Sequence, residues 1–313
     1  MVLRADDELR HPSTDIPEWR ESMWYCFDIP EQQLGAVIYY AYTPNTAKPS
    51  ARLISYVTRG WNRTPNTLLY SFDQEIAIPD GEWDDLNVAG IARFKRLEPL
   101  KRWKVSFHDG KRFHLDMEVD LFAGNWHWID NIYETPRCLA GDRYHRPFAA
   151  QGEMTLDGQR YALDVTGDSD HSWGPRRWEP LHKSKYVAGQ CGRNWATSFI
   201  EVVDADGSVR PYGFVWDGKR MSPISSVEIS GEYDDDGIHR GVLMNIVDDE
   251  ARLTRIRGEC FASAPTETEK VSNNDCYFTF SVNEGQHRGS GILSFYWHRD
   301  YYHRVMRRPA KGT

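Results

Sequence analysis

Apolar side chains recur along most of the chain at every second position or in short runs, a pattern that predicts β-strands. Gly, Pro, Asn or Asp bound each of these segments and favour turns there. No stretch of a dozen residues places apolar positions three and four apart, so we expect few helices. The predicted strands are residues 24–29, 34–42, 52–57, 68–72, 91–97, 103–107, 113–122, 153–156, 161–165, 195–203, 209–216, 227–233, 238–246, 253–261, 277–282 and 292–297.

Asp-Gly pairs mark several of the intervals between successive predicted strands. Asp-Gly supplies the positive φ angles that tight β-hairpins require, so these pairs predict antiparallel neighbours. A succession of hairpins forms an up-and-down meander, which curls into a barrel or a sandwich. The fold class expected is therefore all-β. The pairs are Asp109-Gly110, Asp157-Gly158, Asp206-Gly207, Asp217-Gly218 and Asp236-Gly237.

A chain of 313 residues is long enough for two domains of this kind. Residues 130–150 lack clean alternation and contain two prolines, so the joint between two β-rich halves is expected there. We predict an N-terminal β-barrel domain over 13–145 and a C-terminal β-barrel domain over 146–303. The first twelve residues and the tail 304–313 are expected to be peripheral.

The charge balance excludes some classes of partner. With 38 basic and 46 acidic residues the formal net charge is −8, whereas nucleic acids and anionic membranes select a basic face. No apolar run approaches the roughly 18 residues of a membrane span, and the N-terminus lacks the regions of a signal peptide. The sequence thus predicts a cytoplasmic protein without an integral membrane span, and it leaves open whether the chain forms a homo-oligomer.

Cofactor and metal motifs are absent from the sequence. There is no GxxxxGK[ST] or GxGxxG loop, the five cysteines form no CxxC pair, and none of the eleven histidines falls in HExxH. No cofactor and no metal are therefore predicted. A metal-dependent hydrolase or oxygenase stays open as a weaker alternative, because ligands from distant strands leave no local pattern.

One segment, residues 168–178 (DSDHSWGPRRW), is unusually dense in reactive side chains. If it is extended, Asp168 and Asp170 share one face, and His171 and Trp173 share the other. Two neighbouring carboxylates repel each other, which favours retention of a proton on one of them, and Arg176 would orient Asp170. The same residues could instead form a buried network that pins a loop, and the sequence leaves both interpretations open.

The string GDSDHSWGPRRW resembles the G-x-x-D-H-x-W-G-x-R signature of the lipocalin-like AttH and carotenoid 1,2-hydratase (hydroxyneurosporene synthase) superfamily. Residues 21–45 also look like the opening strands of that family. The resemblance implies two lipocalin-like β-barrels and a cofactor-independent site for apolar molecules, with chemistry at C=C or C–O bonds. Asp170, His171, Trp173, Gly174 and Arg176 match the signature, whereas Asp168 falls at a variable position.

Aromatic residues make up 13% of the chain, and several lie beside histidines. Ring faces stabilise cation-like states, so these clusters are candidates for a cavity lining. We therefore expect a cofactor-independent hydratase, dehydratase, lyase or isomerase that acts by acid/base catalysis on a hydrophobic small molecule such as an isoprenoid, polyketide or aromatic metabolite. The alternative is a non-catalytic binding protein for an apolar ligand. The predicted catalytic residues are Asp170, His171, Arg176 and Asp168, and the predicted substrate-binding residues are Trp173, Trp126, Trp128, Trp297 and His298.

Overall fold

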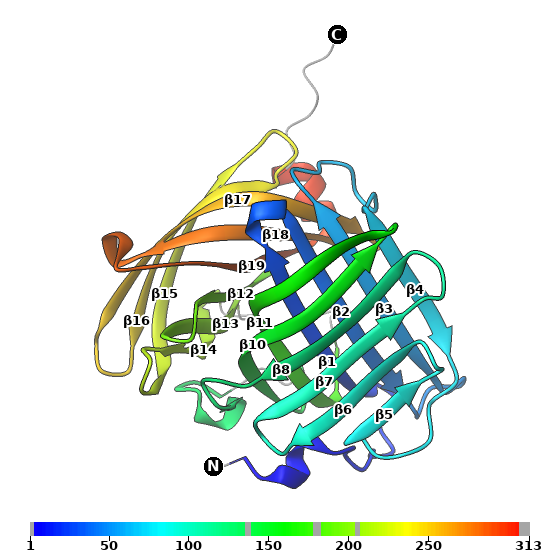
Figure 1. The fold of residues 1–313 in the computed structure, drawn as a ribbon. Coiled ribbons are helices and arrows are strands. Elements are labelled where there is room, and N and C mark those ends of the chain that lie inside the picture. The colour runs from blue at the N-terminus through cyan, green and yellow to red at the C-terminus, as the bar shows by residue number, and fades with distance from the viewer. Residues whose placement is uncertain (1–2, 135–138, 178–182, 204–206, 307–313) are drawn as a thin grey trace.

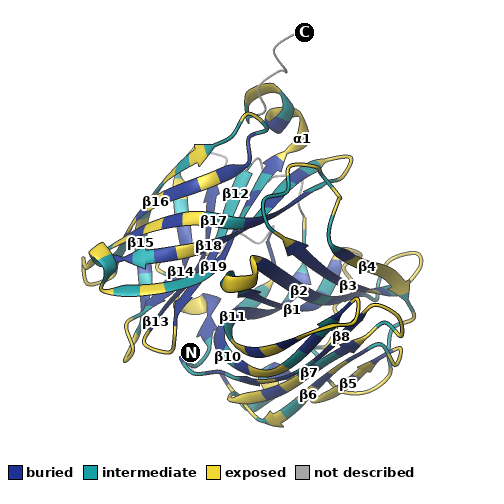
Figure 2. Cartoon of the chain, turned by 45° about the horizontal axis from the view of Figure 1, so that its top comes forward, coloured by how far each residue is buried: buried dark blue, intermediate teal, exposed yellow. Residues whose placement is uncertain are grey.

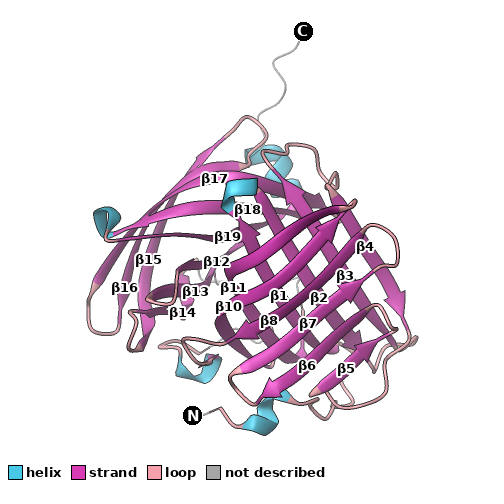
Figure 3. Ribbon diagram, viewed as in Figure 1, coloured by secondary structure: helices cyan, strands magenta, loops and turns pink. Residues whose placement is uncertain are grey.

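In the computed structural model, which describes residues 3–134, 139–177, 183–203 and 207–306, the chain is built almost entirely from antiparallel strands (Figure 3). They form two curled sheets that lie side by side (Figure 1). The all-β fold class predicted from the alternation is confirmed. No helix among these residues is long and apolar enough to cross a membrane.

The first sheet is open and curls on itself, with the strand order β4-β3-β2-β1-β11-β10-β8-β7-β6-β5 and a short β9 beside β10. Its end strands, β4 and β5, are edges, and the sheet is hereafter the open barrel. Its strands are β1 (Trp19–Ile29), β2 (Leu34–Thr43), β3 (Ser50–Arg59), β4 (Tyr70–Ile76), β5 (Asp85–Val88), β6 (Ala92–Glu98), β7 (Arg102–His108), β8 (Phe113–Asp120), β9 (Trp126–His127), β10 (Asp142–Leu156) and β11 (Gln159–Pro175).

The second sheet closes fully, each strand pairing with the next in sequence and β19 pairing with β12. It is hereafter the closed barrel. Its strands are β12 (Lys183–Cys191), β13 (Trp195–Val203), β14 (Val209–Trp216), β15 (Met221–Tyr233), β16 (His239–Asp248), β17 (Leu253–Glu267), β18 (Val271–Val282) and β19 (His287–His298). The helical turns are η1 (Ala5–Glu8), η2 (Pro30–Gln32), η3 (Trp128–Asp130), η4 (Asn283–Gly285), α1 (Arg299–Tyr301) and the π-helical η5 (Tyr302–Met306).

The Asp-Gly pairs lie where hairpins were predicted. Asp157 and Gly158 both have positive φ angles, 49° and 80°, and join β10 to β11. The other four pairs also connect consecutive antiparallel strands, although Asp206 lies outside the described residues. The local turn chemistry therefore sets the meander.

The predicted division at 145/146 and the joint at 130–150 fall on β10, which pairs with β8 and β11 inside the open barrel. The chain passes from one sheet to the other between Pro175 and Lys183 instead. Residues 144–148 are buried without alternation because one face of β10 lines the open barrel and the other faces the closed barrel. A strand covered on both sides loses the period-two pattern that would reveal it.

The N-terminal segment, expected to be peripheral, packs into the end of the open barrel. Glu8 in η1 is fully buried, and its carboxylate accepts hydrogen bonds from Trp103 Nε1 (3.0 Å), the Leu100 amide (2.8 Å) and Arg146 Nη1 (3.2 Å). A buried carboxylate needs such partners, because its desolvation is otherwise prohibitive. At the other terminus, residues from 307 onward lie outside the described part of the chain.

Both barrels have their own aromatic-rich cores, and a third apolar cluster joins them. In Figure 2 the strands β1, β2 and β11, where the barrels meet, are mostly buried. Tyr277 of the closed barrel lies flat against Gly35 of β2, and Tyr56 Oη donates to Asp275 Oδ2 at 2.6 Å. The two barrels are therefore in close contact at these residues.

Candidate functional site

A cavity of about 380 Å³ lies between the two barrels. Residues of β1, β2, β3, β10 and β11 line one side, and residues of β12, β13, β18 and β19 line the other. Its walls are largely aromatic and aliphatic, with a few charged groups among them. The lining residues are Arg20, Trp24, Val37, Tyr39, Ile54, Tyr56, Leu139, Arg143, Asp170, Arg176, Ser184, Tyr186, Ile200, Asn273, Asp275, Ser294 and Tyr296.

The dense segment reaches this cavity because β11 runs through the middle of the open barrel. Asp170 pairs with Trp24 of β1 on one side and with His145 of β10 on the other. The predicted alternation along the segment is observed. Asp168 and Asp170 face the closed barrel, whereas His171 and Trp173 face the interior of the open barrel.

Asp170 is the carboxylate of this segment that lines the cavity. Its Oδ2 atom accepts a hydrogen bond from Arg143 Nη2 at 2.9 Å, and the Arg143 guanidinium lies 5.0 Å from the centre of the Trp128 ring. Its Oδ1 atom is buried and has no hydrogen-bond partner among the described residues. A buried acceptor of this kind is costly unless a ligand or water satisfies it.

Asp168 lies one layer behind the lining. Its Oδ2 atom accepts hydrogen bonds from Tyr186 Oη (2.5 Å) and Ser198 Oγ (2.9 Å), and His145 Nδ1 lies 3.3 Å away. Since Tyr186 itself lines the cavity, Asp168 contributes by fixing that phenol. The two carboxylates therefore have separate sets of partners.

Arg176 lines the cavity as well, but the ion pair with Asp170 is made by Arg143. Arg176 donates to Leu139 O and to Ser172 Oγ, both at 2.8 Å. Burial lowers the pKa of the Arg176 guanidinium to about 10. The role of orienting Asp170, which the sequence assigns to Arg176, thus has a second candidate in Arg143.

His171 and Trp173 lie on the opposite face of β11 from the cavity. His171 Nε2 contacts Glu21 Oε1 and its Nδ1 contacts Tyr144 Oη, both at 2.8 Å, while the Trp173 ring stacks on His11 at 3.7 Å. Burial lowers the pKa of His171, because it disfavours the charged imidazolium. Direct proton exchange between His171 and Asp170 has no support in this geometry.

His11, Glu21 and His171 form a group whose ligand atoms lie within 4.8 Å of one another, close enough to hold a metal ion. His11 Nδ1 and His171 Nε2 both contact Glu21 Oε1 at 2.8 Å. Burial by itself would raise the pKa of Glu21, but the hydrogen bonds from these two imidazoles outweigh it and lower the pKa. Hydrogen bonding within the group accounts for the arrangement.

The four other predicted binding residues lie outside the lining of the cavity among the described residues. Trp126 and Trp128 belong to an apolar cluster with Ile200 and Phe214. The Trp128 ring also lies 5.0 Å from the guanidinium of Arg143, which lines the cavity. Trp297 is in the core of the closed barrel, and His298 ends β19 at the surface. In that region Tyr296, one position earlier, faces the cavity instead.

Sequence reasoning missed most of the lining, including Arg20, Trp24, Tyr39, Arg143 and Tyr186. Trp24 and Arg20 alternate on the face of β1 that pairs with β11, so knowledge of that pairing would have identified them. The pairing joins residues far apart in the chain and leaves no local signal.

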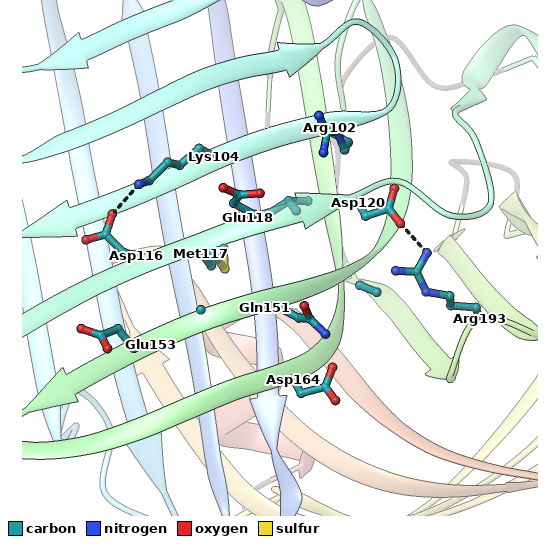
Figure 4. A pocket seen from close by; sticks show the side chains of 13 residues that line it. Arg102, Lys104, Asp116, Met117, Glu118, Asp120, Gln151, Glu153, Asp164 and Arg193 are labelled. Carbon is teal, nitrogen blue, oxygen red and sulfur yellow. Dashed lines mark hydrogen bonds and ion pairs between the residues drawn. The ribbon is translucent and has the colours of Figure 1, made fainter.

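A larger hollow of about 820 Å³ lies on the outer face of β7, β8, β10 and β11, beside the turn that carries Arg193 (Figure 4). Its lining is polar and solvent-exposed, and charges pair across it: Lys104 with Asp116 at 3.6 Å, and Arg193 with Asp120. Exposed, mutually neutralised charges give it little capacity for chemistry.

Comparisons with solved structures place the fold. A putative AttH from Nitrosomonas europaea is 14% identical, with a TM-score of 0.57 over 88% of this chain and 92% of that one. CghA, crystallised with Sch210972, is 13% identical, with a TM-score of 0.58 over 90% and 89%. Kievitone hydratase from Nectria haematococca is 11% identical, with a TM-score of 0.59 over 88% of each chain.

These neighbours confirm the predicted fold, since an AttH-like protein and kievitone hydratase share it over most of their length. No curated protein matches the sequence. The family model described as "Domain of unknown function (DUF7064)" matches residues 4–299, nearly the whole described chain. The chain therefore belongs to the DUF7064 family.

Proposed function

We propose that the protein is a cofactor-independent acid/base enzyme, a hydratase, dehydratase, lyase or isomerase, that acts on a hydrophobic small molecule bound between the two barrels. The observation that carries the proposal is Asp170, which lines the cavity with one carboxylate oxygen buried and without a hydrogen bond. A cavity of about 380 Å³ whose walls combine aromatic and aliphatic side chains with charged groups can hold a small molecule.

In the proposed mechanism Asp170 Oδ1 takes a proton from the substrate and returns one at the next step. Arg143 holds Oδ2 at 2.9 Å and keeps the carboxylate in one orientation. With Oδ2 held in this way, Oδ1 is the atom left to exchange a proton with the substrate. Proton transfer by a positioned side chain contributes about 10²- to 10⁴-fold to the rate.

The walls of the cavity would support the positive charge that develops on the substrate when Asp170 delivers its proton. Trp24, Tyr39 and Tyr186 present aromatic surface to the same space as Asp170. A ring face stabilises a desolvated cation by about 0.5 to 2 kcal/mol. Asp168 assists indirectly, because it holds the Tyr186 hydroxyl.

Two of the structural neighbours are consistent with this proposal. One is named as a hydratase, and another was crystallised with a small organic molecule. Neither similarity specifies a substrate, since the identities are only 11% and 13%.

The test is solvent-deuterium exchange. The purified protein is incubated in D₂O with a panel of apolar ketones, enones and hydroxylated aromatics, and mass spectrometry detects incorporated deuterium or water addition. For any compound that reacts, Asp170→Asn should lower turnover by at least about 100-fold. Asp164→Asn is the matched control, because Asp164 is an exposed residue of the same strand. Unchanged turnover in folded Asp170→Asn would remove Asp170 from the mechanism.

The alternative is a binding protein in which the pair of Asp170 and Arg143 is structural. Under that alternative no compound in the panel exchanges, Asp170→Asn lowers the melting temperature, and Trp24→Ala weakens the binding of apolar ligands.

A further inference from the structure

The charges around the interbarrel cavity do not balance. Three arginines, Arg20, Arg143 and Arg176, line it together with two carboxylates, Asp170 and Asp275. Asp275 lies on the closed-barrel wall and already accepts hydrogen bonds from neutral groups, Tyr56 Oη at 2.6 Å and Asn273 Nδ2 at 2.9 Å. Among the described residues that line the open-barrel wall, Asp170 is thus the one acid beside three guanidinium groups.

Each of the three arginines meets a different kind of partner. Arg143 pairs with Asp170, and the hydrogen bonds of Arg176 include one to a carbonyl and one to a hydroxyl. The Arg20 side chain makes no hydrogen bond and no ion pair with any described residue. Its guanidinium lies 5.2 Å from the centre of the Tyr39 ring. A guanidinium carries five N–H donors and a positive charge, so placing it away from water without a partner is unfavourable.

The environment of Arg20 strengthens this imbalance. Burial, followed by the nearby positive charges of Arg176 and Arg143, lowers the pKa of Arg20 well below its usual value. Like charges that face one cavity repel each other, and an anion bound beside Arg20 would relieve that repulsion. Guanidinium groups bind carboxylates and similar anions through paired hydrogen bonds, better than any other side chain does.

The position of Arg20 also indicates where such an anion would lie. Arg20, Tyr39 and Ile54 line both the cavity and an adjoining groove of about 590 Å³ along β1 to β4. The groove continues to Arg52, which is exposed and already paired with Asp73 at 2.5 Å. Arg20 therefore stands at the neck between an apolar chamber and a polar approach.

We propose that Arg20, supported by Arg176, binds the anionic group of an otherwise apolar small molecule at the neck of the interbarrel cavity. The apolar body of the ligand then lies against Trp24, Val37 and Ile200, within reach of Asp170. The proposal deepens the proposed function, since it names the substrate class of the same cavity. Its test measures binding and needs no turnover, so the two can fail separately.

The experiment compares two fluorescent probes that differ by one anionic group, 1-anilinonaphthalene-8-sulfonate and its uncharged parent N-phenyl-1-naphthylamine. Loss of a buried charge partner costs a bound anion at least about tenfold in affinity. Arg20→Gln should therefore lower the affinity for the sulfonate probe by that factor and change the affinity for the neutral probe by no more than about twofold. Arg93→Gln, at an exposed arginine paired with Asp85, makes the same change in net charge and should alter neither affinity.

A second variant should change the affinity for the sulfonate probe in the opposite direction. Asp170→Asn removes the negative charge beside the arginines, so it should tighten the sulfonate probe and leave the neutral probe unchanged. The proposal is overturned if Arg20→Gln weakens both probes equally, or weakens neither. Retention of anion binding together with unchanged turnover in Asp170→Asn would refute the acid/base mechanism alone.

If Arg20→Gln does not fold, the wild-type protein still decides the question. Naphthalene-2-carboxylate should displace the neutral probe at a concentration at least about tenfold lower than naphthalene-2-carboxamide does, because only the acid has a charge for Arg20. Equal potency of the acid and the amide would overturn the proposal.

Discussion

A single carboxyl group, buried where the barrels meet, couples the stability of this protein to pH. Asp28 near the end of β1 is 5% exposed, and burial raises its pKa from 3.8 to about 7. Its Oδ1 atom has no hydrogen-bond partner among the described residues. The folded state therefore holds a proton on Asp28 at pH values where the unfolded chain has released it.

The sign of the effect follows from that difference. Because the folded pKa lies above the unfolded one, the full contribution to stability is present below about pH 4 and is lost as pH rises to about 7. We predict that Asp28→Asn, which cannot ionise, is more stable than the wild type at pH 8 by about 2 kcal/mol or more. Urea denaturation at pH 5 and pH 8 measures the change.

The advantage of Asp28→Asn should shrink as the pH falls, and this separates ionisation from packing. Asp80→Asn, at an exposed site, is the control and should behave like the wild type throughout. An advantage independent of pH would mean that Asp28 has the same pKa in the folded and the unfolded chain, so that burial does not raise it.

At the scale of the elements, the sequence predicts a strand well when one of its faces is exposed to solvent. The strand β7, whose residues alternate between buried and more exposed, agrees with the predicted range 103–107 to within one residue at each end. By contrast β12 was not predicted, and residues 142–150 of β10 were assigned to a joint, because these stretches are buried on both faces and lose alternation. The candidate site lies on such a strand, since residues 167–172 of β11 are all buried. The sequence therefore indicated which residues of this segment are reactive, but not which side chains surround them.

The N-terminal turn η1 is the element whose structure departs most from expectation, and it suggests a double-mutant cycle. Glu8 in η1 and Arg146 in β10 are both fully buried and lie 3.2 Å apart. Removing one partner takes the nearest opposite charge from the other, which costs up to about 3 to 5 kcal/mol, although Arg96 Nη1 still lies 3.5 Å from Glu8 Oε2. We predict losses of this order for Glu8→Gln and for Arg146→Met, measured as the free energy of unfolding.

The double variant should lose clearly less than the sum of the two single losses, because no unpaired charge remains. The Arg146 side chain also lies against Tyr25, Trp103 and Tyr144, so methionine preserves part of its packing. Additive losses would mean that η1 and β10 are stabilised independently.

At the scale of the whole molecule, the site depends on how two separately packed barrels meet. Each interior is filled by its own core, so the cavity that contains Asp170 arises from the outer faces of β1, β2, β3 and β11 against the closed barrel. A resemblance in one short segment could indicate the fold and point to Asp170. It could not place Arg20, Tyr186 or Tyr296, which reach the cavity only through the contact between barrels.

That contact can be tested at Gly35, where the backbone of β2 approaches the Tyr277 ring. A Cβ atom on Gly35 would lie 2.2 Å from Tyr277 Cε2, and Tyr277 is fully buried, so the ring cannot move aside into solvent. We predict that Gly35→Ala forces the barrels apart and lowers the free energy of unfolding by about 1 to 3 kcal/mol. Gly241→Ala is the matched control, because a Cβ atom there would meet chiefly the exposed side chain of Glu232.

Rescue distinguishes a steric cause from a general loss of stability. Tyr277→Leu alone should destabilise the protein by removing ring contacts, yet combined with Gly35→Ala it makes room for the new methyl group. The loss of stability in the double variant should therefore be smaller than the sum of the two single losses by about 0.5 kcal/mol or more. If the losses simply add, Tyr277 is not what holds Gly35 in place, and the packing of one barrel on the other does not depend on this contact.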